Sequence, residues 1–238
     1  MLNNKKTNND DSSCCSKFWG IHTTACELIS FSMRYPSQTL YEAVSTGEWK
    51  EAVCEIWTKL NLEIPDDFMA DLTNTQKVDY HDLRVEATEL FVCHPSAKCS
   101  PYESYWRSEG NDVRPLMFVS PYSKDVEHFC LSCGLAQSKE WINEPLDHIA
   151  TEFELLQYLA SIESGMWAPT DQGPAIHDLP GGSASAAFKL FCNDHVFTFA
   201  PQLAQRMQQE AQTSYYRAVG KMIESYVIAL KEGHILEE

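Results

Sequence analysis

The spacing of apolar residues is the feature that most constrains the fold of this chain. Apolar side chains recur every three or four positions, as on one face of an α-helix, in segments 19–35, 47–60, 76–93, 121–135 and 183–231. No stretch combines strict apolar/polar alternation with hairpin turn signals, as an exposed β-strand would. The 238 residues suffice to bury a substantial core. We therefore predict an all-α fold built as a helical bundle.

The clearest helix start lies at Asn143-Glu144-Pro145. Asn143 or Glu144 can act as the N-cap, and a proline fits the first helical turn because its missing N–H would have no partner there. An apolar stripe follows, consisting of Leu146, Ile149, Phe153, Leu156 and Ala160. The sequence thus predicts a helix from about residue 145, with Glu144, Asp147 and His148 around its first turn.

Glycine and proline indicate the domain organisation. Segment 165–182 holds seven of the 21 Gly and Pro residues, so we interpret it as a hinge loop. It separates an N-terminal helical lobe (17–164) from a C-terminal helical pair (183–238) within one functional domain. Residues 1–16 are polar, which is typical of a disordered tail. Pro201 is expected to start or break a helix.

The hinge also bears on the oligomeric state. A loop of this kind would let two chains exchange their C-terminal helices. We therefore expect either a monomer or a domain-swapped homodimer.

The charge balance restricts the partners. The chain has 34 acidic and 18 basic residues and a net charge of −16. Such a surface repels nucleic acid and anionic lipid and attracts basic ligands. From Glu140 to Phe188 there are eight acidic residues and no Lys or Arg. This segment is either a site for a basic ligand or a solvated helix face.

Localisation follows from what the sequence lacks. The first 20 residues contain no apolar core segment, and no later run is long enough to span a membrane. We therefore expect a cytoplasmic protein without stable membrane insertion.

The cysteines leave a metal or redox function open. The chain has nine, an odd number, and without a secretory signal we expect reduced thiols. Cys130 and Cys133 form a CxxC, with Cys93 and Cys99 upstream, so four thiolates could bind zinc or an iron–sulfur cluster. Because this spacing is not a strong metal pattern, we favour ordinary free thiols.

Two groups of residues are candidate binding sites. Glu144, Asp147, His148 and Glu152 lie near the predicted helix start. There they would form a capping network, the polar anchors of a binding groove or, least favoured, a metal site. Segment 101–106, Pro-Tyr-Glu-Ser-Tyr-Trp, supplies aromatic rings that either fill a core or grip an apolar peptide.

No catalytic constellation accompanies these groups. The chain lacks G-x-S-x-G, G-x-x-x-x-G-K-[ST] and G-x-G-x-x-G. Nothing assembles a nucleophile, a base and an oxyanion site. We therefore expect neither an enzyme nor a bound cofactor.

Three pieces of sequence carry a family resemblance. They are Leu83-Arg84-Val85-Glu86 followed by Glu89-Leu90-Phe91, then Ser100-Pro101-Tyr102-Glu103-Ser104, and finally Glu144-Pro145-Leu146-Asp147-His148-Ile149-Ala150-Thr151-Glu152. In order and spacing they resemble the TorD/DmsD family of redox-enzyme maturation chaperones, in the NarJ-like superfamily. Glu-Pro-x-Asp-His is the most specific motif, and the resemblance covers about residues 19–230.

The resemblance implies a function in protein export. The chaperone would bind the N-terminal twin-arginine leader and the apo form of a molybdenum-cofactor oxidoreductase, and hold it for cofactor insertion. It implies leader-binding roles for Pro145, Asp147 and His148, and for Pro101, Tyr102 and Ser104. The acidic and aromatic neighbours Glu144, Glu152, Tyr105 and Trp106 complete the candidate site.

Two alternatives to this function stay open. One is a NarJ-like assembly factor for a redox subunit that is not exported. The other is a metal- or redox-responsive protein that uses Cys93, Cys99, Cys130 and Cys133.

Overall fold

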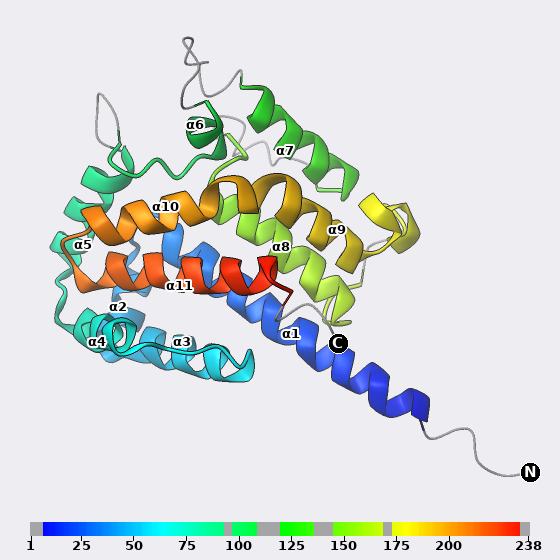
Figure 1. Ribbon diagram of the computed structural model, residues 1–238, viewed down its shortest axis with the longest axis horizontal. Helices are drawn as coiled ribbons and strands as arrows, with labels where there is room; N and C mark the ends of the chain where they lie inside the picture. Colours follow the sequence, from blue (N-terminus) through cyan, green and yellow to red (C-terminus); the bar gives the residue numbers. More distant parts are fainter. Residues whose placement is uncertain (1–6, 93–96, 109–119, 136–144, 169–172, 234–238) are drawn as a thin grey trace, which may run out of the picture.

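The computed structural model describes residues 7–92, 97–108, 120–135, 145–168 and 173–233, and the regular structure in this part of the chain is helical (Figure 1). The predicted all-α fold is therefore confirmed. The α-helices are α1 (Thr7–Met33), α2 (Gln38–Thr46), α3 (Glu48–Lys59), α4 (Asp66–Asn74), α5 (Tyr80–Ala87), α6 (Glu103–Arg107), α7 (Pro121–Ser132), α8 (Ile149–Glu163), α9 (Ala184–Phe191), α10 (Phe197–Glu210) and α11 (Ser214–Lys231). Within the described ranges no helix is long and apolar enough to cross a membrane.

The core lies where α1, α8, α10 and α11 meet (Figure 1). α1 packs along α8, and α10 packs along α11, which also rests on α4. Gly220 of α11 allows the close approach of α10, because a Cβ there would lie 2.8 Å from the carbonyl oxygen of Ala204. The small α6 and the longer α7 sit together at one end of the bundle (Figure 1).

Buried aromatic residues tie the helices together without leaving polar atoms unpaired. The indole N–H of Trp49 donates to Ser32 Oγ at 2.8 Å, and that of Trp57 donates to Ser225 Oγ at 2.9 Å. The Tyr226 hydroxyl lies 2.7 Å from His22 Nδ1. Each contact joins two helices and removes the cost of burying an unsatisfied donor.

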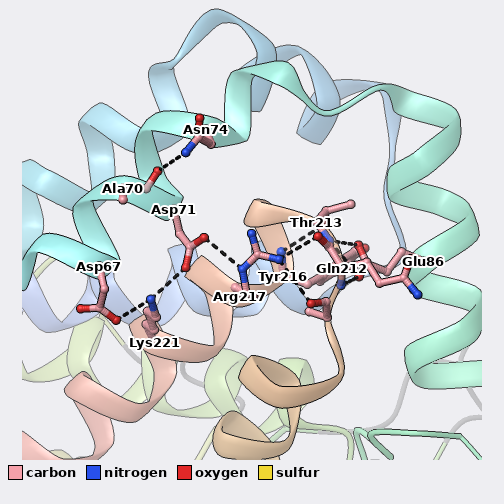
Figure 2. Close-up of polar contacts among 11 residues, drawn as sticks. Asp67, Ala70, Asp71, Asn74, Glu86, Gln212, Thr213, Tyr216, Arg217 and Lys221 are labelled. Atoms are coloured by element: carbon pink, nitrogen blue, oxygen red, sulfur yellow. Dashed lines mark hydrogen bonds and ion pairs between the residues drawn. The ribbon is translucent and has the colours of Figure 1, made fainter.

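The turn between α10 and α11 is clamped by Glu86 of α5 (Figure 2). Both oxygens of this buried carboxylate accept the Thr213 N–H, at 3.0 and 3.1 Å, and one also accepts the Gln212 N–H. The clamp places a negative charge at the positive N-terminal end of α11. Glu86, from the first resembling segment, therefore has a structural role.

A second set of contacts fixes α11 to α4 (Figure 2). Arg217 donates to Asp71 at 3.0 Å and also to the carbonyl oxygens of Ala211 and Gln212. Lys221 lies 2.8 Å from Asp71 and 2.6 Å from Asp67. Because Asp71 is buried and accepts from both cations, its charge is compensated.

The start of α8 differs from the prediction. The helix begins at Ile149, and His148 is its N-cap, with Nδ1 accepting the Ala150 N–H at 3.1 Å. The cause is an isolated antiparallel bridge between Tyr102 and His148. Glu103 N–H donates to the Asp147 carbonyl and Ile149 N–H to the Pro101 carbonyl, both at 2.9 Å. This pairing holds the backbone extended, so residues 145–148 do not join the helix, while Asn143 and Glu144 lie outside the described residues.

Two more helix predictions differ in detail. The single helix expected over 76–93 is divided: a 3₁₀ turn ends at Lys77, Asp79 caps α5 by accepting the His81 N–H at 2.7 Å, and a π-turn occupies Thr88–Val92. Pro201 neither starts nor ends a helix but lies inside α10. Its missing N–H costs one hydrogen bond, while the α10 residues around it remain buried, namely Phe199, Ala200, Leu203, Ala204 and Met207.

The predicted tail and hinge are only partly described. α1 begins at Thr7, inside the segment 1–16 expected to be disordered, and lengthening an existing helix needs no new nucleation. In the hinge segment, Ile176–Asp178 and Pro180–Gly182 form 3₁₀ turns, and Gly181 and Gly182 have φ of +77° and +86°. The division into two lobes and a hinge stays a prediction.

The clamp on α11 generates a stability prediction. Glu86→Ala should lower the free energy of unfolding by about 2–3 kcal/mol, because the N–H groups of Gln212 and Thr213 lose their charged acceptor. Urea unfolding measures the change. Glu89→Ala is the matched control in the following turn; it removes a half-buried carboxylate that lies 3.4 Å from Lys98. The control should cost under about 1 kcal/mol, and equal losses would contradict the clamp.

Candidate functional site

The Tyr102–His148 bridge brings two of the resembling segments together. Their rings meet edge to face, with centroids 5.1 Å apart and an interplanar angle of 85°. Both side chains are partly exposed. Next to them on α6, Tyr105 and Trp106 form a second edge-to-face pair at 5.5 Å, and the Trp106 indole donates to the Ser100 carbonyl at 2.8 Å. The segments thus bring together one partly exposed ring pair, and a second partly exposed pair lies on the adjoining α6.

The remaining candidate residues lie beneath this surface. Those that the structure buries are Pro101, Ser104, Pro145, Asp147 and Glu152. Glu144 lies outside the described residues. The candidate site therefore has an accessible aromatic layer and a buried polar layer.

Asp147 connects the two layers. It is fully buried, and its Oδ2 accepts the Ser104 N–H at 2.9 Å. Its backbone carbonyl accepts the Glu103 N–H in the bridge. A carboxylate oxygen that accepts a free N–H in the first turn of α6 satisfies that group and complements its partial positive charge. Asp147 therefore orients α6 relative to the start of α8.

Sequence reasoning missed the partners of Glu103. This carboxylate is fully buried and accepts from Arg107 at 2.6 Å, and its second oxygen lies 3.0 Å from Nδ1 of His195. His195 sits on a π-turn (Cys192–Val196) and stacks on Phe191 at 4.6 Å. The i,i+4 spacing of Glu103 and Arg107 is a local signal for the first pair, whereas nothing local indicates His195.

Glu152 is the unusual member of the buried layer. Within the described ranges neither of its oxygens has a hydrogen-bond donor, and the side chain is fully buried. Burial, together with the negative charges of Glu103 and Asp147, raises its pKa well above the ordinary value. A proton on Glu152 resolves the conflict, because a carboxylic acid can donate to the neighbouring Glu103 carboxylate.

His148 is neutral at physiological pH. Burial, and next the positive charge of Arg34, lower its pKa to about 4. Since Nδ1 accepts the Ala150 N–H, the ring proton of the neutral imidazole is on Nε2. His148 can therefore pack against apolar groups and donate one hydrogen bond, but it neither attracts nor repels a cation.

Three of the four cysteines in the metal or redox alternative keep their protons at neutral pH. Burial raises the pKa of Cys99 and Cys130 to about 12 and that of Cys133 to about 11. Cys93 lies outside the described residues. Among the residues that are described, no three His, Cys, Asp or Glu side chains are placed to hold a metal ion. The cysteine-based alternative gains no support from this arrangement.

Comparison with known proteins gives a family match. A model of the nitrate reductase delta subunit family matches residues 46–205, a range that contains all three resembling segments. No curated protein sequence matches significantly. Among solved structures, the chain is similar to a proposed redox enzyme maturation protein from Archaeoglobus fulgidus. The identity is 20%, the coverage is 87% of this chain and 93% of that one, and the TM-score is 0.49. This structural likeness carries no functional inference.

The raised pKa of Glu152 predicts a pH-dependent stability. Between its ordinary pKa of about 4.5 and the raised value, the folded state binds a proton that the unfolded state releases. Stability from this group therefore falls as pH rises through that window. Glu152→Gln cannot ionise, so its stability relative to wild type should increase with pH, by up to about 1.4 kcal/mol per unit.

Urea unfolding of both proteins from pH 5 to 8 measures this difference. The opposite slope from His148, whose pKa is lowered, is present in both proteins and cancels. A difference that does not change with pH would contradict protonation of Glu152.

The thiol pKa values predict slow alkylation. After brief exposure to iodoacetamide at pH 7.5, mass spectrometry should find Cys130 and Cys133 largely unmodified in the folded protein, because protonated buried thiols are poor nucleophiles. In urea both should react fully. Rapid modification of either cysteine without urea would show a reactive thiol and revive the redox alternative.

Proposed function

Because the chain belongs to the nitrate reductase delta subunit family, a family of chaperones for redox-enzyme maturation, we propose that it is a cytoplasmic chaperone for a molybdenum-cofactor oxidoreductase. It binds the N-terminal twin-arginine leader of the apo-enzyme and holds it until the cofactor has been inserted. The leader then becomes available for export. The protein itself has no catalytic role in this cycle.

The observation that carries this proposal is the joining of Tyr102 and His148 above a buried polar layer. Aromatic and imidazole rings that are already ordered can contact a peptide with little loss of side-chain entropy. The backbone bridge and the N-cap bond of His148 supply that order. Tyr105 and Trp106 enlarge the surface that an apolar segment can cover.

The buried residues contribute indirectly. Asp147 and Glu152 are fully buried, so neither can pair with a leader arginine without leaving its place. We assign to them, and to Pro101, Ser104 and Pro145, the role of positioning the accessible rings. Carboxylates at the surface, together with the net charge of −16, attract the basic leader.

One observation favours a second candidate. The matching family is named after the delta subunit of nitrate reductase. This name fits an assembly factor for a redox subunit that is not exported. Such a factor would use the same apolar surface, but its preferred peptide would lack paired arginines. The two candidates differ in their response to those arginines.

Calorimetric titration with a synthetic leader peptide tests the proposal. The peptide comes from a molybdoenzyme encoded beside this gene, and a second version carries lysine in place of both arginines. We expect micromolar or tighter binding that weakens at least tenfold on the change to lysine, because lysine cannot form the bidentate contacts of arginine. Equal binding of both peptides would favour the assembly factor, and no binding of either would overturn the leader-binding proposal.

Variants of the accessible pair test the site. Tyr102→Ala and His148→Ala should each weaken leader binding about tenfold, as expected when a central ring is removed from an interface. His177→Ala, in an exposed 3₁₀ turn, is the control and should bind like wild type. Wild-type affinity in both site variants would remove this pair from the leader site.

A further inference from the structure

A groove follows α1 between α3 and α8. It consists of neighbouring depressions of about 500, 470 and 360 Å³ in the described part of the chain. The first shares Thr24, Ala52 and Ile56 with the second, and Glu27, Glu154 and Gln157 with the third. They therefore form one continuous depression, which spans residues 17–34 of α1, or about 25 Å.

The lining of this groove is largely apolar. Ile21, Leu28 and Phe31 of α1 line it, with Ile56 of α3 and Tyr158 of α8. One end is formed by two residues that follow α8.

These two residues, Met166 and Trp167, are unusually accessible, with 69% and 52% of their surfaces exposed. Methionine and tryptophan are enriched in interfaces because they offer large contact areas, and methionine adapts its shape. Their exposure beside an apolar groove indicates that a partner covers them.

The charges of the groove indicate the chemistry of that partner. Glu27 stands in the middle, exposed, and forms no ion pair with the residues that the structure describes. By contrast, Glu154 lies 2.7 Å from Arg34, and at the far end Glu55 lies 2.5 Å from Lys59. The centre of the groove therefore carries a carboxylate without a compensating cation, which suits an apolar segment that bears a positive side chain.

Arg34 connects the groove with the surroundings of the Tyr102–His148 pair. Arg34 lines the groove and donates to Thr151, in the first turn of α8, at 3.5 Å. Its charge also acts on the imidazole of His148. A peptide that contacts the ring pair can therefore extend past Arg34 into the groove.

We propose that this groove binds the apolar segment of the leader and that Glu27, rather than the buried Asp147 or Glu152, pairs with a leader arginine. This inference rests on the proposed function and adds a location and a charge partner to it. A length of about 25 Å accommodates roughly 17 helical residues or seven extended ones, which is the scale of a leader's apolar segment.

A double-mutant cycle tests the arginine contact. Glu27→Gln is titrated with the leader peptide and with a version in which both arginines are glutamine. Each single change should weaken binding about fivefold or more, and the two together should weaken it less than the product, because they remove the same interaction. Glu63→Gln, an exposed acid outside the groove, makes the same charge change and should be additive with the peptide change.

A second pair of variants tests the apolar contact. Trp167→Ala should weaken leader binding about tenfold. Leu131→Ala removes a side chain of similar exposure, 53%, that does not line the groove, and it should leave binding unchanged. All four positions are exposed, so urea unfolding should show unaltered stability.

The outcomes separate the two proposals. In one outcome the wild type binds the leader, Glu27→Gln is additive with the peptide change, and Trp167→Ala binds like wild type. This outcome would overturn the groove and leave the proposed function intact. Leader binding that depends on Trp167 but is additive at Glu27 would overturn the arginine contact alone. A wild-type protein that binds no leader peptide would overturn both the groove and the proposed function.

Discussion

Two backbone hydrogen bonds between segments 101–103 and 147–149 set the geometry on which the candidate site depends. They hold residue 148 extended, which makes His148 the N-cap of α8 and places its ring against Tyr102. They also bring the Asp147 carboxylate to the first turn of α6. One short bridge therefore fixes the start of two helices and the Tyr102–His148 ring pair.

The segments joined by the bridge bury carboxylates whose negative charges need compensation. Glu103, Asp147 and Glu152 are all fully buried, and three carboxylates in one place would repel each other strongly. Arg107 and His195 lie against Glu103, the Ser104 N–H donates to Asp147, and burial among these charges raises the pKa of Glu152. Glu103 and Asp147 therefore have structural contacts within the fold, and these contacts hold the segments that carry Tyr102 and His148 in place.

The sequence predicts helices well and contacts between distant residues poorly. The apolar spacing of segment 47–60 correctly predicts the helix α3, whose buried residues are Trp49, Val53, Ile56 and Trp57, because helix periodicity is a local property. The start of α8 was misplaced because the bridge partner lies more than 40 residues away. Contacts such as Glu103–His195 and Glu86–Thr213, separated by 92 and 127 residues, leave no local signature.

The same contrast separates the two parts of the proposed leader site. The motif residues are recognisable in the sequence because they lie in short contiguous segments. The groove has no such requirement: Glu27, Ile56 and Trp167 come from three separate segments and owe their proximity to the packing of α1 against α3 and α8. In the proposed site, recognition of the leader has two parts, the ordered ring pair and the adaptable, partly exposed groove. The first part aligns the peptide, and the second can accommodate its particular apolar side chains and charge.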